Sequence, residues 1–145
     1  MSILCAKVDI VLKKVYYKIK NHFEKRKIIK NWKLANKHNF TVLKSLSAAT
    51  YVKVGNFTYG EINVCCYGRK DFPVLKIGNF CSLAKQVMFL LKSEHGTSYV
   101  SSYPFITKLG LDDEFDETLS KGDICVDDDV WIGYGATIMS GVHIG

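Results

Sequence analysis

His95 is the residue of this chain whose type and position best suit chemistry. A histidine can take a proton from a hydroxyl group, because an ordinary pKa of about 6.5 leaves its ring mostly neutral yet basic near neutral pH. His95 lies between two stretches of repeated sequence, whereas His22 and His38 precede the repeats and His143 follows a valine expected to point inward. We therefore assign a general-base role to His95 and no catalytic role to the other three. An exposed loop histidine without a role is the alternative.

Other side chains that could bind a metal ion form no recognisable site. Asp127, Asp128 and Asp129 follow one another, but a run of like charges at a corner of the chain is normally a solvated turn. The five cysteines include no CxxC pair and no zinc spacing. Cys81 occupies a position that requires a small interior residue, so we expect a buried, reduced thiol there. The sequence predicts no metal cofactor.

The elements that must position His95 are predicted from a repeat of six residues. Steps of six give Val126, Ile132, Ile138 and Ile144, and a second series four places further on gives Val130, Ala136 and Val142. A helix has a period of 3.6 residues and a strand a period of two, so neither explains a period of six. A β-solenoid does, because each step is then a short strand and a turn whose aliphatic side chain points into a narrow coil. Ordinary half-buried strands with a glycine turn are the alternative.

The same rule recurs earlier in the chain. It fits the stretches that begin at Val54, Ile77 and Leu83. The series continues to Phe89, but the distance from Phe89 to Val126 is not a multiple of six. A segment of about residues 90–123 must therefore leave the coil, and this excursion carries His95.

Four blocks of sequence resemble a known family. They read VGNFTYG, LKIGNFCSLA, SEHGTSYVSSYPF and VDDDVWIGYGATIMSGVHIG. In order and spacing they are similar to the hexapeptide-repeat acetyltransferases of the xenobiotic branch, which contains the chloramphenicol and streptogramin acetyltransferases and relatives from surface-polysaccharide gene clusters. The resemblance runs from about Asn39 to the last residue. It implies a single-stranded left-handed parallel β-helix over residues 39–145, a homotrimer, and acetyl-CoA as the acetyl donor.

The resemblance also implies a site around His95. The family carries its catalytic histidine on an extended loop near the subunit boundary, the position that His95 has here. Antibiotic-modifying members tend to have Gly-Asn before this histidine, whereas Ser93 and Glu94 are more similar to the polysaccharide-associated relatives. We therefore expect a sugar hydroxyl of a surface polysaccharide as the acceptor, with O-acetylation of a chloramphenicol or streptogramin antibiotic as the alternative. We expect Glu94 to be a solvated loop carboxylate.

Further binding residues follow from the same resemblance. The family lines its acceptor pocket with this excursion, which maps to Tyr103, and Tyr59 would approach from another coil. Ring faces with a hydroxyl suit a sugar or a macrocycle equally. In the relatives the pantetheine arm of CoA lies along the coil wall between two subunits, which maps to Trp131, Gly133 and Tyr134. Packing of these aromatic rings within the chain is the alternative.

The N-terminal segment differs from the rest in charge. Residues 1–50 carry twelve Lys and Arg against two acidic residues, and Ile10, Val15 and Ile19 fall near helical spacing. We expect a basic amphipathic helix over residues 1–38. Its apolar stripe would pack on the solenoid or a neighbouring subunit, which we favour, or rest on an anionic membrane surface. Nucleic acid is not an expected partner.

Length and composition bound the remaining expectations. The 145 residues, 48% of them hydrophobic, suit one domain with a core. No cleavable signal peptide and no membrane-spanning apolar run is evident, so we expect a cytoplasmic protein, at most peripheral to the inner face of the membrane. The repeat stops at Gly145, where the family continues with further coils. A fragment or an inactive, weakly trimeric protein with poor CoA binding is therefore a third hypothesis.

Overall fold

The structure, a computed structural model, describes residues 3–68, 70–112 and 114–145. Side chains are described from Tyr16 onward, apart from Ile19 and the two gaps. The chain divides into two units, one ending at Ala35 and one that runs from Asn36 to Gly145. The two units are described separately, and the candidate site belongs to the second.

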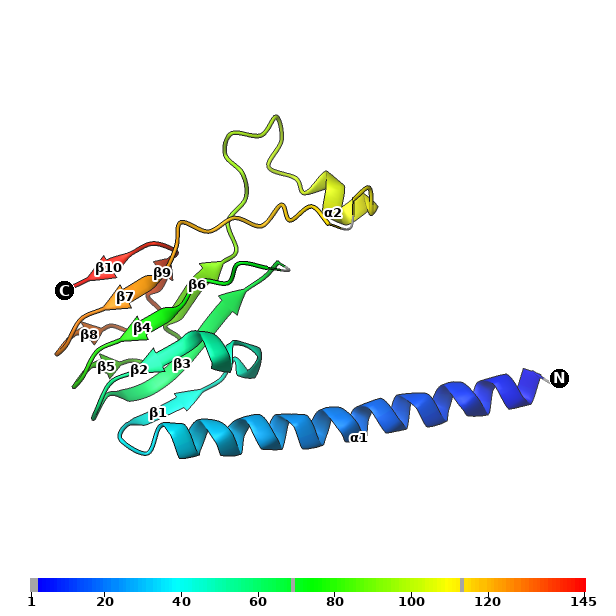
Figure 1. Cartoon of the computed structure of the whole chain (residues 1–145), viewed down its shortest axis with the longest axis horizontal. Coiled ribbons are helices and arrows are strands. Elements are labelled where there is room, and N and C mark those ends of the chain that lie inside the picture. The colour runs from blue at the N-terminus through cyan, green and yellow to red at the C-terminus, as the bar shows by residue number, and fades with distance from the viewer. Residues whose placement is uncertain (1–2, 69, 113) are drawn as a thin grey trace. The chain divides into compact units, whose positions relative to one another are not determined.

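The first unit is a single long helix. Helix α1 (Ile3–Ala35) is unbroken (Figure 1), and its sequence contains no proline. Its apolar residues are spread around the helix axis rather than gathered on one face, and Tyr16, Tyr17 and Phe23 are all more than half exposed. An interfacial helix needs an apolar face. The helix as a whole therefore offers no support for the predicted stripe or for the membrane contact inferred from it, and the side chains of Ile10, Val15 and Ile19 lie outside those that the structure describes.

No helix within the described residues combines the length and the apolar character needed to cross a bilayer.

The second unit consists mainly of short parallel strands. They are β1 (Phe40–Leu43), β2 (Val52–Val54), β3 (Tyr59–Cys66), β4 (Leu75–Ile77), β5 (Ser82–Leu83), β6 (Met88–Lys92), β7 (Ile124–Val126), β8 (Trp131–Ile132), β9 (Thr137–Met139) and β10 (His143–Ile144). A 3-10 helix, η1 (Leu46–Tyr51), precedes β2. Every pairing between these strands is parallel.

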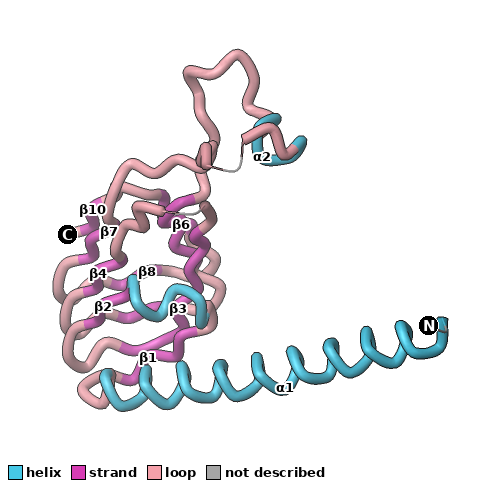
Figure 2. The backbone as a smooth tube through the Cα atoms, turned by 45° about the vertical axis from the view of Figure 1, so that its right-hand side comes forward, coloured by secondary structure: helices cyan, strands magenta, loops and turns pink. Residues whose placement is uncertain are grey.

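The strands form three rows that the chain visits in a fixed order. The first row is β2, β4, β7 and β10, which lie one above another along one side in Figure 2. The second row is β1, the start of β3, β5 and β8, and the third is the end of β3, β6 and β9. Each passage runs from the first row to the second and then to the third. This succession of parallel strands is compatible with the predicted β-helix.

Each step of six residues takes the chain from one row of strands to the next. Val126 pairs with Ile77, Ile132 with Leu83, and Ile138 with Phe89. All six side chains are buried, with exposed fractions of at most 9%. The members of the repeat therefore stack on equivalents from earlier passages and not on their neighbours in the series. Ile144, three steps after Val126, pairs with Val126.

Polar side chains line one corner between the first two rows. Backbone N–H of Asn56 donates to the side-chain oxygen of Asn79 (2.8 Å), and backbone N–H of Asn79 donates to a carboxylate oxygen of Asp128 (2.7 Å). A Cβ at Gly55 would lie 2.6 Å from the backbone of Gly78, so this corner needs glycine. Asp128 is thus engaged by its neighbour and is more than the solvated turn that the sequence predicted.

A buried thiol lies beside this corner. Cys81 is fully buried and free, and its Sγ donates to the backbone oxygen of Asp127 at 3.0 Å. The predicted buried, reduced cysteine is confirmed.

The excursion occupies residues 93–123, between β6 and β7. It extends away from the strands and contains the short helix α2 (Phe105–Leu109) (Figures 1 and 2). Gly110 ends α2 in the left-handed conformation at φ 64°. The sequence placed the excursion at about residues 90–123 and did not predict the helix.

Candidate active site on the excursion

The excursion and the two residues that follow β3, Tyr67 and Gly68, line a cavity of about 440 Å³. Its lining comprises Tyr67, Gly68, Ser93, Glu94, His95, Pro104, Thr107, Lys108, Phe115, Asp116, Glu117 and Thr118. His95 belongs to this lining and is an exposed side chain. A ligand in the cavity can therefore reach its ring.

One hydrogen bond defines the protonation pattern of His95. Its Nδ1 lies 2.7 Å from the backbone oxygen of Ser102. A carbonyl oxygen can only accept a hydrogen bond, so Nδ1 carries the proton in the neutral ring. Nε2 is then left with its lone pair, which is the state that a general base requires.

Glu117 forms another wall of the same cavity. Its two carboxylate oxygens accept backbone N–H bonds from Ile106 (3.3 Å) and Thr107 (2.7 Å) at the start of α2. Burial raises the pKa of this carboxyl, but the hydrogen bonds from Thr107 and Ile106, aided by the charge of His95, outweigh burial and lower the pKa of Glu117. Glu117 therefore stays ionised and faces a ring that gains positive charge when it accepts a proton.

A second, mainly apolar cavity of about 430 Å³ adjoins the first. Tyr99, Tyr103, Phe105 and Ile106 contribute to its lining, and it shares Phe115 and Glu117 with the cavity of His95. The rings of Tyr103 and Phe105 meet edge to face with centroids 4.8 Å apart. Aromatic rings thus line a cavity that adjoins the cavity of His95.

The other predicted binding residues lie elsewhere on the strands. Tyr59 and Trp131 both pair with Ser82 across the second row, and their side chains are 53% and 79% exposed. Around Gly133 there is open space, and Tyr134 is 68% exposed. Each of the three rings is therefore more than half exposed. The cavity of His95 contains none of the four, so one chain presents the predicted site in two parts.

Glu94 differs from its prediction. Its side chain is 14% exposed, receives the hydroxyl hydrogen bond of Ser140, and lies 3.5 Å from Nζ of Lys121. The expectation of a solvated loop carboxylate is wrong, because the chain folds a distant turn against it.

Several polar residues of the site were missed by sequence reasoning. Ser102 contributes its backbone carbonyl, and Glu117 accepts backbone N–H bonds from the first turn of α2. Neither role has a sequence signal. Asp116 forms an ion pair with Lys92 at 3.0 Å, both side chains being 8% exposed. The hydroxyl of Ser93 is buried and has no hydrogen-bond partner among the described residues.

No grouping of three or more ligating side chains that could hold a metal ion occurs in the part of the chain that the structure describes.

Fold and site together define a protein of parallel β-strands with a tautomer-fixed histidine on an inserted segment. No family model matches the chain. It is 37% identical over 82 residues to a chloramphenicol acetyltransferase of Escherichia coli, covering 53% of this chain and 39% of that protein. It is 38% identical over 76 residues to a probable macrolide acetyltransferase of Lysinibacillus sphaericus, covering 49% and 42%. A chloramphenicol acetyltransferase of Morganella morganii is 34% identical over 82 residues.

These similarities support an acetyltransferase family and thus an acyltransferase. The chain spans about two fifths of the length of the curated relatives it matches. None of the three names refers to a polysaccharide. The predicted sugar acceptor is therefore without support, and the antibiotic alternative is favoured.

Proposed function

We propose that the protein is an acetyl-CoA-dependent O-acetyltransferase whose acceptor is a small antibiotic with a free hydroxyl, of the chloramphenicol or macrolide kind. The observation that carries this proposal is the 2.7 Å contact between Nδ1 of His95 and the carbonyl of Ser102. It leaves Nε2 as a base in a ligand-sized cavity. The names of the similar proteins supply the reaction and the acceptor class.

His95 performs both proton transfers in this mechanism. Nε2 accepts the hydroxyl proton of the acceptor as the hydroxyl oxygen bonds to the thioester carbonyl carbon. The imidazolium then returns that proton to the sulfur as the carbon–sulfur bond breaks. Glu117 and the carbonyl of Ser102 stabilise the transient positive charge on the ring, because both present oxygen atoms to the site.

Acetyl-CoA supplies the activated acetyl group as a thioester. Trp131, Gly133 and Tyr134 suit its pantetheine arm, because two exposed rings flank Gly133, where a Cβ would meet only open space. An extended arm can lie along such a surface and use backbone groups for its amides.

The aromatic cavity beside His95 suits the acceptor. Its lining of Tyr99, Tyr103, Phe105 and Ile106 offers ring faces to an apolar body, and the shared wall at Phe115 and Glu117 leads to the histidine. In this arrangement Tyr103 binds the acceptor and His95 receives its hydroxyl.

We also propose that the three strand rows are the walls of a left-handed β-helix and that three chains assemble. The cyclic succession of parallel rows supports the coil. The division of the site supports assembly, because His95 and Tyr103 stand on the excursion while Tyr59 and Trp131 stand on the second row. A neighbouring copy would supply the missing part.

A thiol-release assay tests the function. Purified protein would be incubated with acetyl-CoA and, in turn, chloramphenicol, a macrolide, a streptogramin and simple sugars. We expect release with an antibiotic, and we expect His95→Ala to lower kcat by about 10²- to 10⁴-fold, since a general base contributes that much. His143→Gln is the control, because His143 pairs with Asp127 at 2.8 Å, away from the cavity.

Equal rates for the native protein and His95→Ala would remove His95 as the base. Release with sugars alone would restore the polysaccharide acceptor. No release with any acceptor would favour the inactive, trimer-forming alternative.

A further inference from the structure

The excursion is joined to the strands by a neck formed by Glu94 and residues 119–122. Backbone N–H of Glu94 donates to the oxygen of Leu119 (3.1 Å), and backbone N–H of Leu119 donates to the oxygen of Glu94 (2.8 Å). This antiparallel bridge ties the outgoing segment to the returning one. His95 directly follows Glu94 in the outgoing segment.

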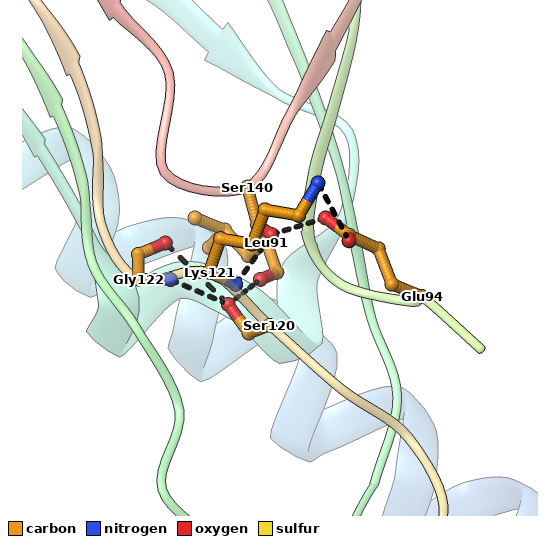
Figure 3. A network of polar contacts seen from close by, with 6 residues as sticks. All are labelled: Leu91, Glu94, Ser120, Lys121, Gly122 and Ser140. Carbon is orange, nitrogen blue, oxygen red and sulfur yellow. Dashed lines mark hydrogen bonds and ion pairs between the residues drawn. The ribbon is translucent and has the colours of Figure 1, made fainter. Parts of the chain in front are cut away.

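The side chain of Glu94 adds a third segment to the neck. Its carboxylate points to the turn after β9, where the hydroxyl of Ser140 donates to it (Figure 3). The same hydroxyl oxygen accepts the backbone N–H of Lys121 at 2.8 Å. Ser140 is 2% exposed and the side chain of Glu94 is 14% exposed. One buried hydroxyl thus connects both sides of the neck to the strands.

Other contacts hold the returning segment in the same place. The hydroxyl of Ser120 donates to the oxygen of Leu91 (2.7 Å) and accepts the N–H of Gly122 (3.1 Å) (Figure 3). The oxygen of Gly122 accepts the N–H of Gly141 at 3.1 Å. A Cβ at Gly141, whose φ is +74°, would lie 2.8 Å from Lys121, so the segments are in direct contact.

We propose that Glu94 is a positioning residue, whose hydrogen bond with Ser140 clamps the neck of the excursion and so fixes the place of His95 over its cavity. The inference rests on the proposed function, in which His95 is the base. Two constraints then set the position of Nε2: the carbonyl of Ser102 orients the ring, and the clamp at Glu94 holds the backbone that carries it.

The chemistry of the contact suits this role. A hydrogen bond from a hydroxyl to a carboxylate is charge-assisted and stronger than a neutral one, and low exposure strengthens it further. Lys121 contributes less, because its side chain is 74% exposed and exposed ion pairs contribute little. The pair of Glu94 and Ser140 is therefore the centre of the clamp.

The test uses the full chain with four variants and one control. Glu94→Ala and Ser140→Ala each remove one side of the clamp, and the double variant removes both. Glu94→Gln keeps an oxygen that can accept from Ser140. Glu114→Gln is the matched control, because Glu114 is an exposed carboxylate on the same excursion.

Two readouts are measured on every variant. Hydrogen exchange of residues 91–96 and 119–122, without ligands, reports the neck directly. Thiol release gives kcat and the KM for acetyl-CoA. We expect faster exchange at the neck in Glu94→Ala and Ser140→Ala, and a fall in kcat of about 10- to 100-fold with KM within about twofold, as for a displaced catalytic group. Glu94→Gln should lie between these variants and the native protein.

The double variant should be no worse than the more severe of the two single variants, since Glu94 and Ser140 share one contact and only Ser140 also binds the backbone N–H of Lys121. Lower kcat with unchanged exchange at the neck would overturn the proposal, and so would faster exchange with unchanged kcat. If native protein transfers no acetyl group, the proposed function fails. Exchange then still decides whether the clamp holds the neck: unchanged exchange in Glu94→Ala and Glu94→Gln would refute it.

Discussion

At the scale of single residues, the site depends on which polar atoms have partners. Nδ1 of His95 lies within hydrogen-bond distance of the carbonyl of Ser102, and that contact leaves its second nitrogen for chemistry. Glu94 and Ser140 satisfy each other away from solvent. Ser93 is the contrasting case, since its buried hydroxyl has no partner among the described residues. Pairing, more than residue type, therefore separates the roles of these neighbours.

Ser93 and Ser140 provide a matched pair of substitutions. A buried polar group without a partner costs about 1–3 kcal/mol, so Ser93→Ala should leave the free energy of unfolding unchanged or raise it. Ser140→Ala should lower the free energy of unfolding by about 1–3 kcal/mol, because the hydroxyl bonds with both Glu94 and Lys121. Urea denaturation of both variants measures the difference. A clear loss of stability in Ser93→Ala would show that its hydroxyl is bonded in solution.

At the scale of the elements, corners and ion pairs hold the short strands in register. Strands of two or three residues bury little surface, so the polar contacts between successive corners matter more than in a long sheet. Asn56, Asn79 and Asp128 form one such series. The buried pair of Lys92 and Asp116 does the same between the strands and the excursion.

Asp128 makes the stability of the corner depend on pH. The backbone and side-chain N–H groups of Asn79 lower the pKa of Asp128 below its ordinary value. A carboxyl whose folded pKa is depressed contributes stability above its unfolded pKa of about 3.9, and this contribution is lost as pH falls through the folded value. Asp128→Asn should therefore lose less stability between pH 7 and pH 3 than the native protein.

Denaturation by urea at pH 7, 5 and 3 measures this difference, with Glu114→Gln as a control for removal of an exposed carboxylate. Parallel losses in the native protein and Asp128→Asn would show that Asn79 does not hold the carboxylate in solution.

At the scale of the whole molecule, exposed aromatic side chains support the proposed assembly of several chains. Tyr59 and Trp131 stand on the second row, and the rings of Phe57 and Phe80 stack with centroids 5.4 Å apart while more than half exposed. Large exposed apolar groups that share one region commonly mark an interface. This agrees with the proposal that His95 of one copy acts beside Trp131 of another.

Mixed assemblies test this sharing. His95→Ala and Trp131→Ala should each lower acetyl transfer when purified alone. Unfolded together in equal amounts and refolded, they should regain about one quarter of the native rate, since one boundary in four then carries both intact residues. Differently tagged chains confirm the mixing. Mixed assemblies with no recovery would place the complete site within one chain.

The repeat made much of the fold predictable. A period of six in apolar residues is a local property, so the sequence alone marked Val126, Ile132 and Ile138 as interior and marked where the excursion leaves the strands. It also singled out His95 by its place outside the repeats. The stripe predicted in α1 has no support from the helix as a whole, because a few residues at suitable spacing do not make an apolar face along its full length.

What the sequence by itself determined is therefore the succession of strands, the inserted segment and its histidine. Only the tertiary structure decided that the carbonyl of Ser102 orients the His95 ring, that Glu117 accepts a backbone N–H from the first turn of α2, and that Ser140 meets Glu94 from 46 positions away. The physical reason is the separation along the chain of the residues that interact. Periodic burial is set by neighbours along the chain, whereas hydrogen bonds to backbone carbonyls and to distant turns exist only after the fold has brought those atoms together.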